Sequence, residues 1–317
     1  MFKSLLFALS LATSAQAGDL ATLRVATQVS GTVNWELTTI TQNGFDTANG
    51  FRLEVADVAG GPAAQIAFEG GAADVIVSDW LWVARQRAEG RDYVFIPYSK
   101  AVGALYVPAT STAQTLPDLK GSQIGIAGGP VDKSWLILRA YAQSQYGFDL
   151  AGQTSQVFGA PPLIYQTALD GQFGGAINFW HFGAKMQAAG LRPLVTVQEA
   201  ALALGLNPDT PLLGYVVQGA LLRDHPDVAA GLAKASRAAK ALLASDDAAW
   251  QALRPQMNAK SEAEFQALIA GFRQGIPSAG AVDEAAAAKL LAVMADLGGA
   301  ELVGNLKTLP AGTFYTP

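Results

Sequence analysis

Four short segments each combine a tryptophan with hydrogen-bonding side chains, at places where a predicted strand passes into a predicted helix. They are residues 29–36, 78–80, 128–135 and 178–181. In open α/β sheets, ligands bind beyond the carboxyl ends of the strands, where the amino ends of the helices point. A tryptophan there supplies a flat apolar wall and one N–H donor, which suits an organic ring or a cation. The pattern therefore predicts a ligand cleft with aromatic walls.

A structural role competes with ligand binding at each of these positions. Acidic and hydroxyl side chains at helix starts commonly act as caps, and a single tryptophan there commonly packs on the neighbouring strand. Four tryptophans in equivalent places favour binding, whereas Trp82 and Trp250 fall within predicted helices and are assigned to packing. The predicted ligand-binding residues are Asn34, Trp35, Glu36, Ser78, Asp79, Trp80, Gly129, Asp132, Ser134, Trp135, Asn178, Trp180 and His181.

The charges in these segments indicate the class of ligand. Glu36 and Asp79 stand at predicted ligand loops, and Lys133 is the one base near them in the sequence. An excess of acidic groups attracts cations and repels anions. We therefore expect a compact cation, an amine or a nitrogen heterocycle.

The sequence predicts no catalytic residue, no metal site and no cofactor. It contains no cysteine and two histidines, too few for a metal site of ordinary spacing. It has no Gly-x-Ser-x-Gly elbow, and its Gly128-Gly129 turn belongs to neither a Walker pattern nor a dinucleotide fingerprint. His181 with Glu36 or Asp79 would form an acid–base pair, but a binding pocket would use the same residues.

The elements that must position these segments alternate between short β-branched runs and helical stretches. Such alternation predicts parallel sheets covered by helices on both faces. After Pro226 the chain is predicted to be mostly helical. Strands are predicted at residues 23–27, 53–58, 75–78, 93–97, 124–127, 156–158, 176–178 and 213–217, and helices at 34–42, 79–89, 133–146, 161–170, 180–189, 227–243, 248–253, 262–272 and 283–297.

A weak internal repeat relates residues 71–90 to residues 171–190 at a constant offset of 100 positions. Trp80 falls on Trp180, and both copies read as glycine, short apolar strand, tryptophan-led helix and glycine. Any two strand–helix units share part of this spacing, so the similarity on its own leaves two interpretations. The functional one is a pair of similar lobes, with Trp80 and Trp180 on opposite walls of one cleft.

The N-terminus predicts export. Lys3 precedes a short apolar run, and Ala15-Gln16-Ala17 forms a small-x-small cleavage site, so residues 1–17 have the pattern of a signal peptide. The absence of cysteine excludes a lipid anchor. No later segment has the length and apolarity of a membrane span, and the net charge of −5 argues against a nucleic-acid partner. The remaining length fits two domains.

Several motifs together resemble periplasmic ABC-transporter solute-binding proteins of the nitrate, sulfonate, taurine and thiamine-precursor type, over nearly all of the mature chain. Residues 116–121 followed by 124–126 resemble the Asp-Leu-Lys-Gly turn that enters the second lobe of that family. Residues 23–26, 68–75 and 168–171 are similar to its opening strand and to its paired glycine elements. One position departs from the family, because Gly174-Gly175 stands where Asp-Ala is usual.

The resemblance implies an α/β protein of periplasmic binding protein type II fold, with two lobes joined by a two-crossing hinge. Lobe 1 would comprise residues 18–104 and 214–317, lobe 2 would comprise residues 105–213, and the crossings would lie near 101–107 and 212–217. The implied function is capture of a small organic ligand in the periplasm by a non-catalytic, monomeric protein that delivers it to an inner-membrane ABC permease.

Two other functions remain open on the sequence. One is an accessory binding protein of a periplasmic dehydrogenase system. The other is an enzyme on the same fold, but the related pyrimidine synthase carries a cysteine-rich motif, and the related dehydratase is cytoplasmic. The missing cysteines and the predicted signal peptide weigh against these two enzymes.

Overall fold

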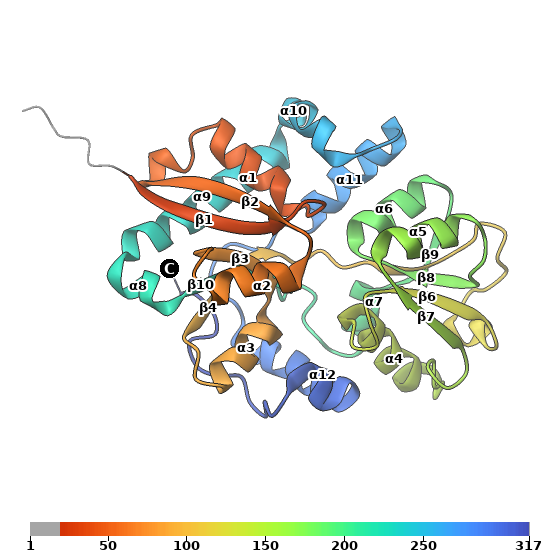
Figure 1. Ribbon diagram of the computed structural model, residues 1–317. Coiled ribbons are helices and arrows are strands. Elements are labelled where there is room, and N and C mark those ends of the chain that lie inside the picture. Colours follow the sequence, from red (N-terminus) through yellow and green to blue (C-terminus); the bar gives the residue numbers. More distant parts are fainter. Residues whose placement is uncertain (1–19, 317) are drawn as a thin grey trace, which may run out of the picture.

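The computed structural model describes residues 20–316, so the predicted signal peptide lies outside the described residues. The chain forms two five-stranded sheets, which lie side by side in Figure 1. The first has the order β2-β1-β3-β10-β4 and the second the order β7-β6-β8-β5-β9. The strands are β1 (Ala21–Gln28), β2 (Phe51–Val58), β3 (Val75–Asp79), β4 (Tyr93–Ser99), β5 (Ala104–Val107), β6 (Gln123–Ala127), β7 (Ser155–Gly159), β8 (Gly175–Ile177), β9 (Arg192–Thr196) and β10 (Leu213–Gln218).

Helices cover both faces of each sheet, as the alternating pattern predicts (Figure 1). Prolines stand in the first turns of α2, α5 and α9, where a missing N–H costs nothing. The helices are α1 (Val33–Gln42), α2 (Gly61–Glu69), α3 (Trp80–Ala88), α4 (Lys133–Tyr146), α5 (Pro161–Leu169), α6 (Trp180–Ala188), α7 (Val197–Ala203), α8 (Gly219–Asp224), α9 (Pro226–Ser245), α10 (Asp247–Met257), α11 (Glu262–Gln274) and α12 (Glu284–Val303).

Both sheets are mixed, which corrects the expectation of parallel sheets. Strand β10 runs antiparallel to β3 and β4, and β5 runs antiparallel to β8 and β9. These two strands are the first that the chain forms after passing from one sheet to the other. Each therefore enters its new sheet from the hinge side, opposite in direction to the strands of the βαβ units around it.

The 100-position repeat corresponds to equivalent places in the two lobes. Its copies form β3–α3 and β8–α6, and β3 and β8 are both third in their sheets. The glycines at 71, 90, 171 and 190 all have positive φ, between 70° and 97°, where L side chains are strained. The two units therefore share backbone geometry as well as residue types.

The departure from the family at position 174 has a local cause. In lobe 1 the equivalent residue is Asp74, which forms an ion pair with Arg24 of β1 at 2.6 Å. In lobe 2 a Cβ at Gly174 would lie 2.7 Å from the Cβ of Ser122. The backbone bond to the neighbouring strand is kept in both lobes, from Asp74 N–H to the carbonyl of Arg24 and from Gly174 N–H to that of Gln123. Close packing against Ser122 therefore occupies the place in lobe 2 where lobe 1 has the ion pair.

Two chain segments join the sheets, residues 100–103 and residues 204–212. The expected crossings at 101–107 and 212–217 were placed too far along the chain, because these ranges consist mostly of β5 and β10. Strands β5 and β9 were not predicted from the sequence.

The C-terminal helix α12 contacts both lobes, at α3 and at α4 (Figure 1). Its Leu290, Leu291 and Met294 belong to an apolar cluster that also contains Trp80 of lobe 1 and Leu136 of lobe 2. A guanidinium nitrogen of Arg85 donates to the carbonyl of Leu302 at 3.1 Å, and Lys289 Nζ donates to the carbonyl of Gly205 at 2.6 Å. Helix α12 therefore ties lobe 1, lobe 2 and the second crossing segment together.

Candidate functional site

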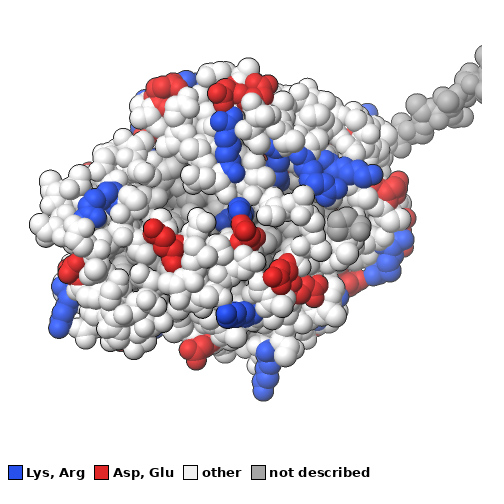
Figure 2. Space-filling model, turned by 180° about the vertical axis from the view of Figure 1, so that it is seen from behind, with Lys and Arg blue, Asp and Glu red and all other residues white. Residues whose placement is uncertain are grey.

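A cavity of about 330 Å³ lies between the two sheets, at the carboxyl ends of β1, β3, β6 and β8. Helices α1, α3, α4 and α6 begin at this edge, so the cavity is where the sheet rule places a ligand. The surface is hollowed between the lobes on the side that Figure 2 shows. Seven predicted site residues line the cavity, namely Asp79, Trp80, Asp132, Ser134, Asn178, Trp180 and His181.

Three of these side chains also fix the local backbone, as the structural alternative anticipates. Asp79 Oδ1 accepts the N–H of Trp82 at 2.9 Å, and Asp132 Oδ1 accepts the N–H of Trp135 at 3.0 Å, so both cap helices. Asn178 donates to the carbonyl of Pro161 at 2.9 Å and accepts the N–H of Phe179 at 2.8 Å. Asp79 can cap α3 and still act in the cavity, because its second oxygen faces the other lobe.

That second oxygen forms an ion pair across the cleft. Lys133 Nζ of lobe 2 lies 3.0 Å from Asp79 Oδ2 of lobe 1, and the two side chains are 29% and 22% exposed. Burial lowers the pKa of Lys133, but the charge and hydrogen bond of Asp79 outweigh it, so the net pKa lies above its ordinary value. The pair links the lobes and cancels one charge of each sign within the site.

The remaining titratable groups set the charge of the cavity. Burial lowers the pKa of His181 to about 4, and the nearby Lys185 contributes to the same shift, so the imidazole is neutral at pH 7. Burial raises the pKa of Asp132 above its usual value, against the hydrogen bond from the N–H of Trp135. With Asp79 and Lys133 paired, Asp132 is the residual acidic group among the described residues that line the cavity.

Glu36 does not line the cavity, which corrects the sequence expectation. It lies one helical turn beyond Thr32 and Val33, which do line it, and its side chain is fully buried in lobe 1. Its carboxylate accepts hydrogen bonds from Lys240 Nζ at 2.6 Å, Ser236 Oγ at 2.6 Å and Tyr215 Oη at 2.8 Å. Glu36 therefore neutralises a buried lysine and says nothing about the charge of the ligand.

Two of the four expected tryptophans are also packed away from the cavity. Trp35 forms edge contacts with Trp180 and Trp250, each at 6.0 Å between ring centroids, and Trp135 is 2% exposed in the core around α4. Trp80 and Trp180 do line the cavity, but they do not stack on each other. Trp80 packs against Phe314 at 5.8 Å.

Three more predicted residues do not line the cavity. Asn34 Nδ2 donates to the carbonyls of Gln28 and Val29 at 2.9 and 3.3 Å, which holds the β1–α1 loop. Ser78 lies on β3 and accepts from Gln65 at 3.5 Å. Gly129 belongs to the β6–α4 loop and lies outside the cavity lining. In each case another residue of the same segment lines the cavity instead, namely Val33, Asp79 and Asp132.

Sequence reasoning missed several lining residues. Tyr98 stands at the end of β4, and its hydroxyl lies 3.4 Å from Thr32 Oγ1. Lys240 Nζ lies 4.8 Å from the centroid of the Tyr98 ring, so this phenol separates the cavity from the buried ion pair. Tyr98, Thr27 and Gln28 could have been predicted, because they are polar residues at the carboxyl ends of β4 and β1. The other missed residues are Ala26, Gly31, Thr32, Val33, Gly61, Ala64, Val77, Leu81, Ala101, Val102, Gly103, Lys133, Phe179, Leu212 and Leu213.

No protein-family model and no curated protein matches this chain. Solved structures do match it over nearly its full length. The periplasmic aliphatic sulphonate-binding protein SsuA of Escherichia coli is 18% identical with a TM-score of 0.70, and 91% of this chain and 95% of that chain are covered. The alkanesulfonate-binding protein SsuA of Xanthomonas axonopodis pv. citri, bound to MOPS, is 17% identical with a TM-score of 0.68, over 93% and 98% of the chains.

The chain has the type II periplasmic binding-protein fold. This confirms the fold class predicted from the sequence, with its two lobes and two crossings. A mutant of DszB in complex with biphenyl-2-sulfinic acid also matches, at 18% identity and a TM-score of 0.58, over 92% and 95% of the chains. At such identities the likeness establishes the fold, and the ligand has to be argued from this chain's own residues.

Two further observations concern the described part of the chain. Within residues 20–316, no group of three or more acidic or histidine side chains is arranged to hold a metal ion. Over the same residues, every helix falls short of the length and apolar character that a membrane crossing needs.

Proposed function

We propose that the protein is a periplasmic solute-binding protein of an ABC importer, which captures a small amine, organic cation or nitrogen heterocycle between its lobes. The observation that carries this proposal is the interlobe cavity, because both lobes contribute polar and aromatic side chains to it. A ligand that contacts both lobes favours the arrangement in which they meet, and that population shift is what a capture protein requires.

The size and lining of the cavity support a small organic ligand. Its volume of about 330 Å³ is at the lower end of the usual range for small-molecule sites. The partly exposed Trp180 of lobe 2 provides aromatic surface, and the fully buried Trp80 of lobe 1 borders the cavity from the opposite lobe, while Thr27, Ser134 and Asn178 provide hydrogen-bonding groups. A compact ring or a substituted amine would meet apolar walls and a few polar contacts, as such sites usually offer.

The charges of the cavity still favour a cation once Glu36 is set aside. The cavity contains the carboxyl groups of Asp79 and Asp132 and the ammonium group of Lys133, and His181 is neutral at pH 7. One acidic group is thus in excess, which favours a cationic or neutral ligand over an anion. A sulfonate would meet this acidic group without an arginine beside it, since none of the described lining residues is an arginine.

A calorimetric screen tests the ligand class. We expect amines and nitrogen heterocycles to bind more tightly than taurine or longer alkanesulfonates at pH 7. Asp132→Asn is the matched variant, because asparagine still caps a helix but carries no charge. It should weaken binding of a cation by about tenfold or more, since a charged hydrogen bond contributes about 1.5–3 kcal/mol. Tight sulfonate binding without amine binding would contradict the proposed ligand class.

Delivery to a permease and location in the periplasm belong to the same proposal. The fold and the signal-peptide pattern of residues 1–17 support them. A fusion of residues 1–17 to a reporter enzyme that works only in the periplasm tests export, with Lys3→Glu as the export-defective control. Steady turnover of a bound compound by the purified protein would instead favour an enzyme on this fold.

A further inference from the structure

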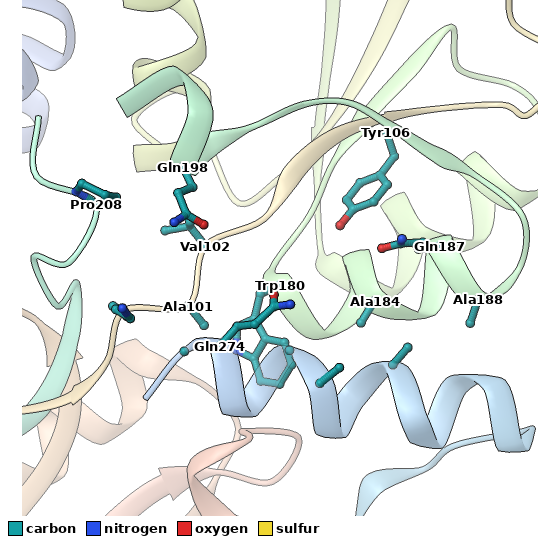
Figure 3. Close-up of a pocket in the computed structure, with 15 residues that line it drawn as sticks. Ala101, Val102, Tyr106, Trp180, Ala184, Gln187, Ala188, Gln198, Pro208 and Gln274 are labelled. Atoms are coloured by element: carbon teal, nitrogen blue, oxygen red, sulfur yellow. The ribbon is translucent and has the colours of Figure 1, made fainter. Parts of the chain in front are cut away.

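A second cavity, of about 370 Å³, adjoins the first crossing segment; we name it the hinge cavity. Helices α6 and α7 of lobe 2 and α11 of lobe 1 form its walls (Figure 3). It shares Ala101, Val102 and Trp180 with the interlobe ligand cavity, but its other lining residues differ. Its polar lining includes Tyr106, Gln187, Gln198 and Gln274.

The two aromatic walls of the hinge cavity rest on glycines. A Cβ at Gly183 would lie 2.8 Å from both Cε2 and Oη of Tyr106, and a Cβ at Gly271 would lie 2.7 Å from Cζ3 of Trp180. Distances this short do not occur for real side chains, so any other residue would displace the rings. Because Gly183 and Gly271 have no side chains, Tyr106 can pack directly against α6 and Trp180 against α11.

The largely buried Tyr106 presents its phenol to this cavity. The residue is 7% exposed, and its hydroxyl makes no hydrogen bond to another residue in the described part of the chain. Figure 3 shows the ring pointing from β5 towards the side of α6 that bears Gln187. Burial raises the pKa of Tyr106 to about 12, so the hydroxyl keeps its proton and can donate. The residue is buried but its hydroxyl reaches the cavity, where water or a ligand can satisfy it.

Three glutamine amides surround the same space. Within residues 20–316, the side chains of Gln187, Gln198 and Gln274 make no hydrogen bond to other protein groups. Each amide offers both donors and an acceptor. The one charged side chain among the described lining residues is Lys100, and it is already paired with Asp209. The hinge cavity is therefore polar but presents no free charge.

We propose that the hinge cavity is a second ligand site, for a neutral, hydroxyl-rich compound of about monosaccharide size. Hydroxyl groups both donate and accept, so they match the amides and the Tyr106 phenol. The C–H face of such a ring would lie on the indole of Trp180. A charged compound would find no partner here and would lose its hydration. The volume falls within the usual range for small-molecule sites.

The test uses the full mature chain with D-glucose, myo-inositol and sorbitol as probes, measured by saturation-transfer NMR and calorimetry. Ala270→Trp fills the cavity from α11, and Ala263→Trp is its control on the same helix, outside the lining. Both alanines are exposed, so neither tryptophan enters the core. We expect millimolar or tighter binding of at least one probe to wild type and to Ala263→Trp, and at least a tenfold loss in Ala270→Trp.

Tyr106→Phe provides a milder variant that removes one oxygen and keeps the ring. Loss of one hydrogen bond should weaken probe binding by about threefold to tenfold. The proposal is overturned if no neutral probe binds the folded wild type at 20 mM, in which case the cavity holds only water. It is equally overturned if Ala270→Trp binds the probes as wild type does. The probes are read directly, so either result leaves the proposed function at the interlobe cavity untouched.

Discussion

Breaking the ion pair between Asp79 and Lys133 should loosen the contact between the lobes. At the observed 3.0 Å, the gross attraction is about 1.4 kcal/mol in bulk water and about 5.5 kcal/mol at an effective dielectric constant of 20. Both side chains are less than one-third exposed, so desolvation offsets most of this attraction. We expect a net coupling of about 1 kcal/mol, close to the upper end for exposed pairs.

A double-mutant cycle on the closing equilibrium measures this coupling. Wild type, Asp79→Asn, Lys133→Met and the double variant would each carry one spin label on each lobe. Pulsed electron–electron double resonance would then give the populations of short and long distances between the two labels. A coupling of about 1 kcal/mol corresponds to roughly a fivefold shift in those populations. In 1 M salt, where the screening length is about 3 Å, most of the coupling should vanish.

The control is the Arg24–Asp74 pair, which lies wholly within lobe 1. Replacing Arg24 by methionine should leave the distance distribution unchanged. A coupling below about 0.3 kcal/mol between Asp79 and Lys133, or one that 1 M salt does not reduce, would refute an electrostatic link between the lobes.

Three further predictions concern stability and binding. Glu36→Gln should cost about 3–5 kcal/mol in urea unfolding, because it leaves Lys240 buried without a countercharge; a loss below about 1 kcal/mol would contradict this. Ligand affinity of the folded variant should change less than twofold. The pKa of His181 is about 4 in the folded protein and about 6.5 when unfolded. Stability should therefore fall by up to about 3 kcal/mol as pH drops from 7 to 4, and His181→Gln should flatten that slope in thermal melts. Gly271→Ala should weaken cleft binding by about tenfold in calorimetry, because its Cβ displaces Trp180; unchanged affinity would show that α11 can shift freely.

The fold was predictable because most of its signals are local. Residues 133–146 were predicted as a helix, and α4 has those bounds, since Asp132 caps its start and Gly147 adopts a left-handed conformation at its end. The antiparallel direction of β5 and β10 was not predictable in this way. A strand's direction depends on which lobe the chain has just left, and strand–helix alternation carries no such information.

The segments that line the interlobe cavity were predictable, and the position of Glu36 shows why the individual side chains were not. Loop positions follow from strand ends, but the direction of each side chain depends on residues distant in the sequence. Glu36 turns inward because Lys240, 204 positions further along the chain, needs a countercharge in the same core. Trp35 turns inward in a similar way, towards Trp250 of α10. Nothing in the sequence around Lys240 or Trp250 indicates that these residues pack against α1.

The contacts of α12 with both lobes restrict the direction in which the lobes can separate. Helix α11 of lobe 1 also packs against α6 of lobe 2, more extensively than α12 packs against α4, so the lobes meet on two sides. Separating the lobes on either side therefore breaks one of these contacts, while the other serves as the pivot (Figure 1). A membrane partner that distinguishes the loaded from the empty protein would have to sense the side whose helix contact is broken.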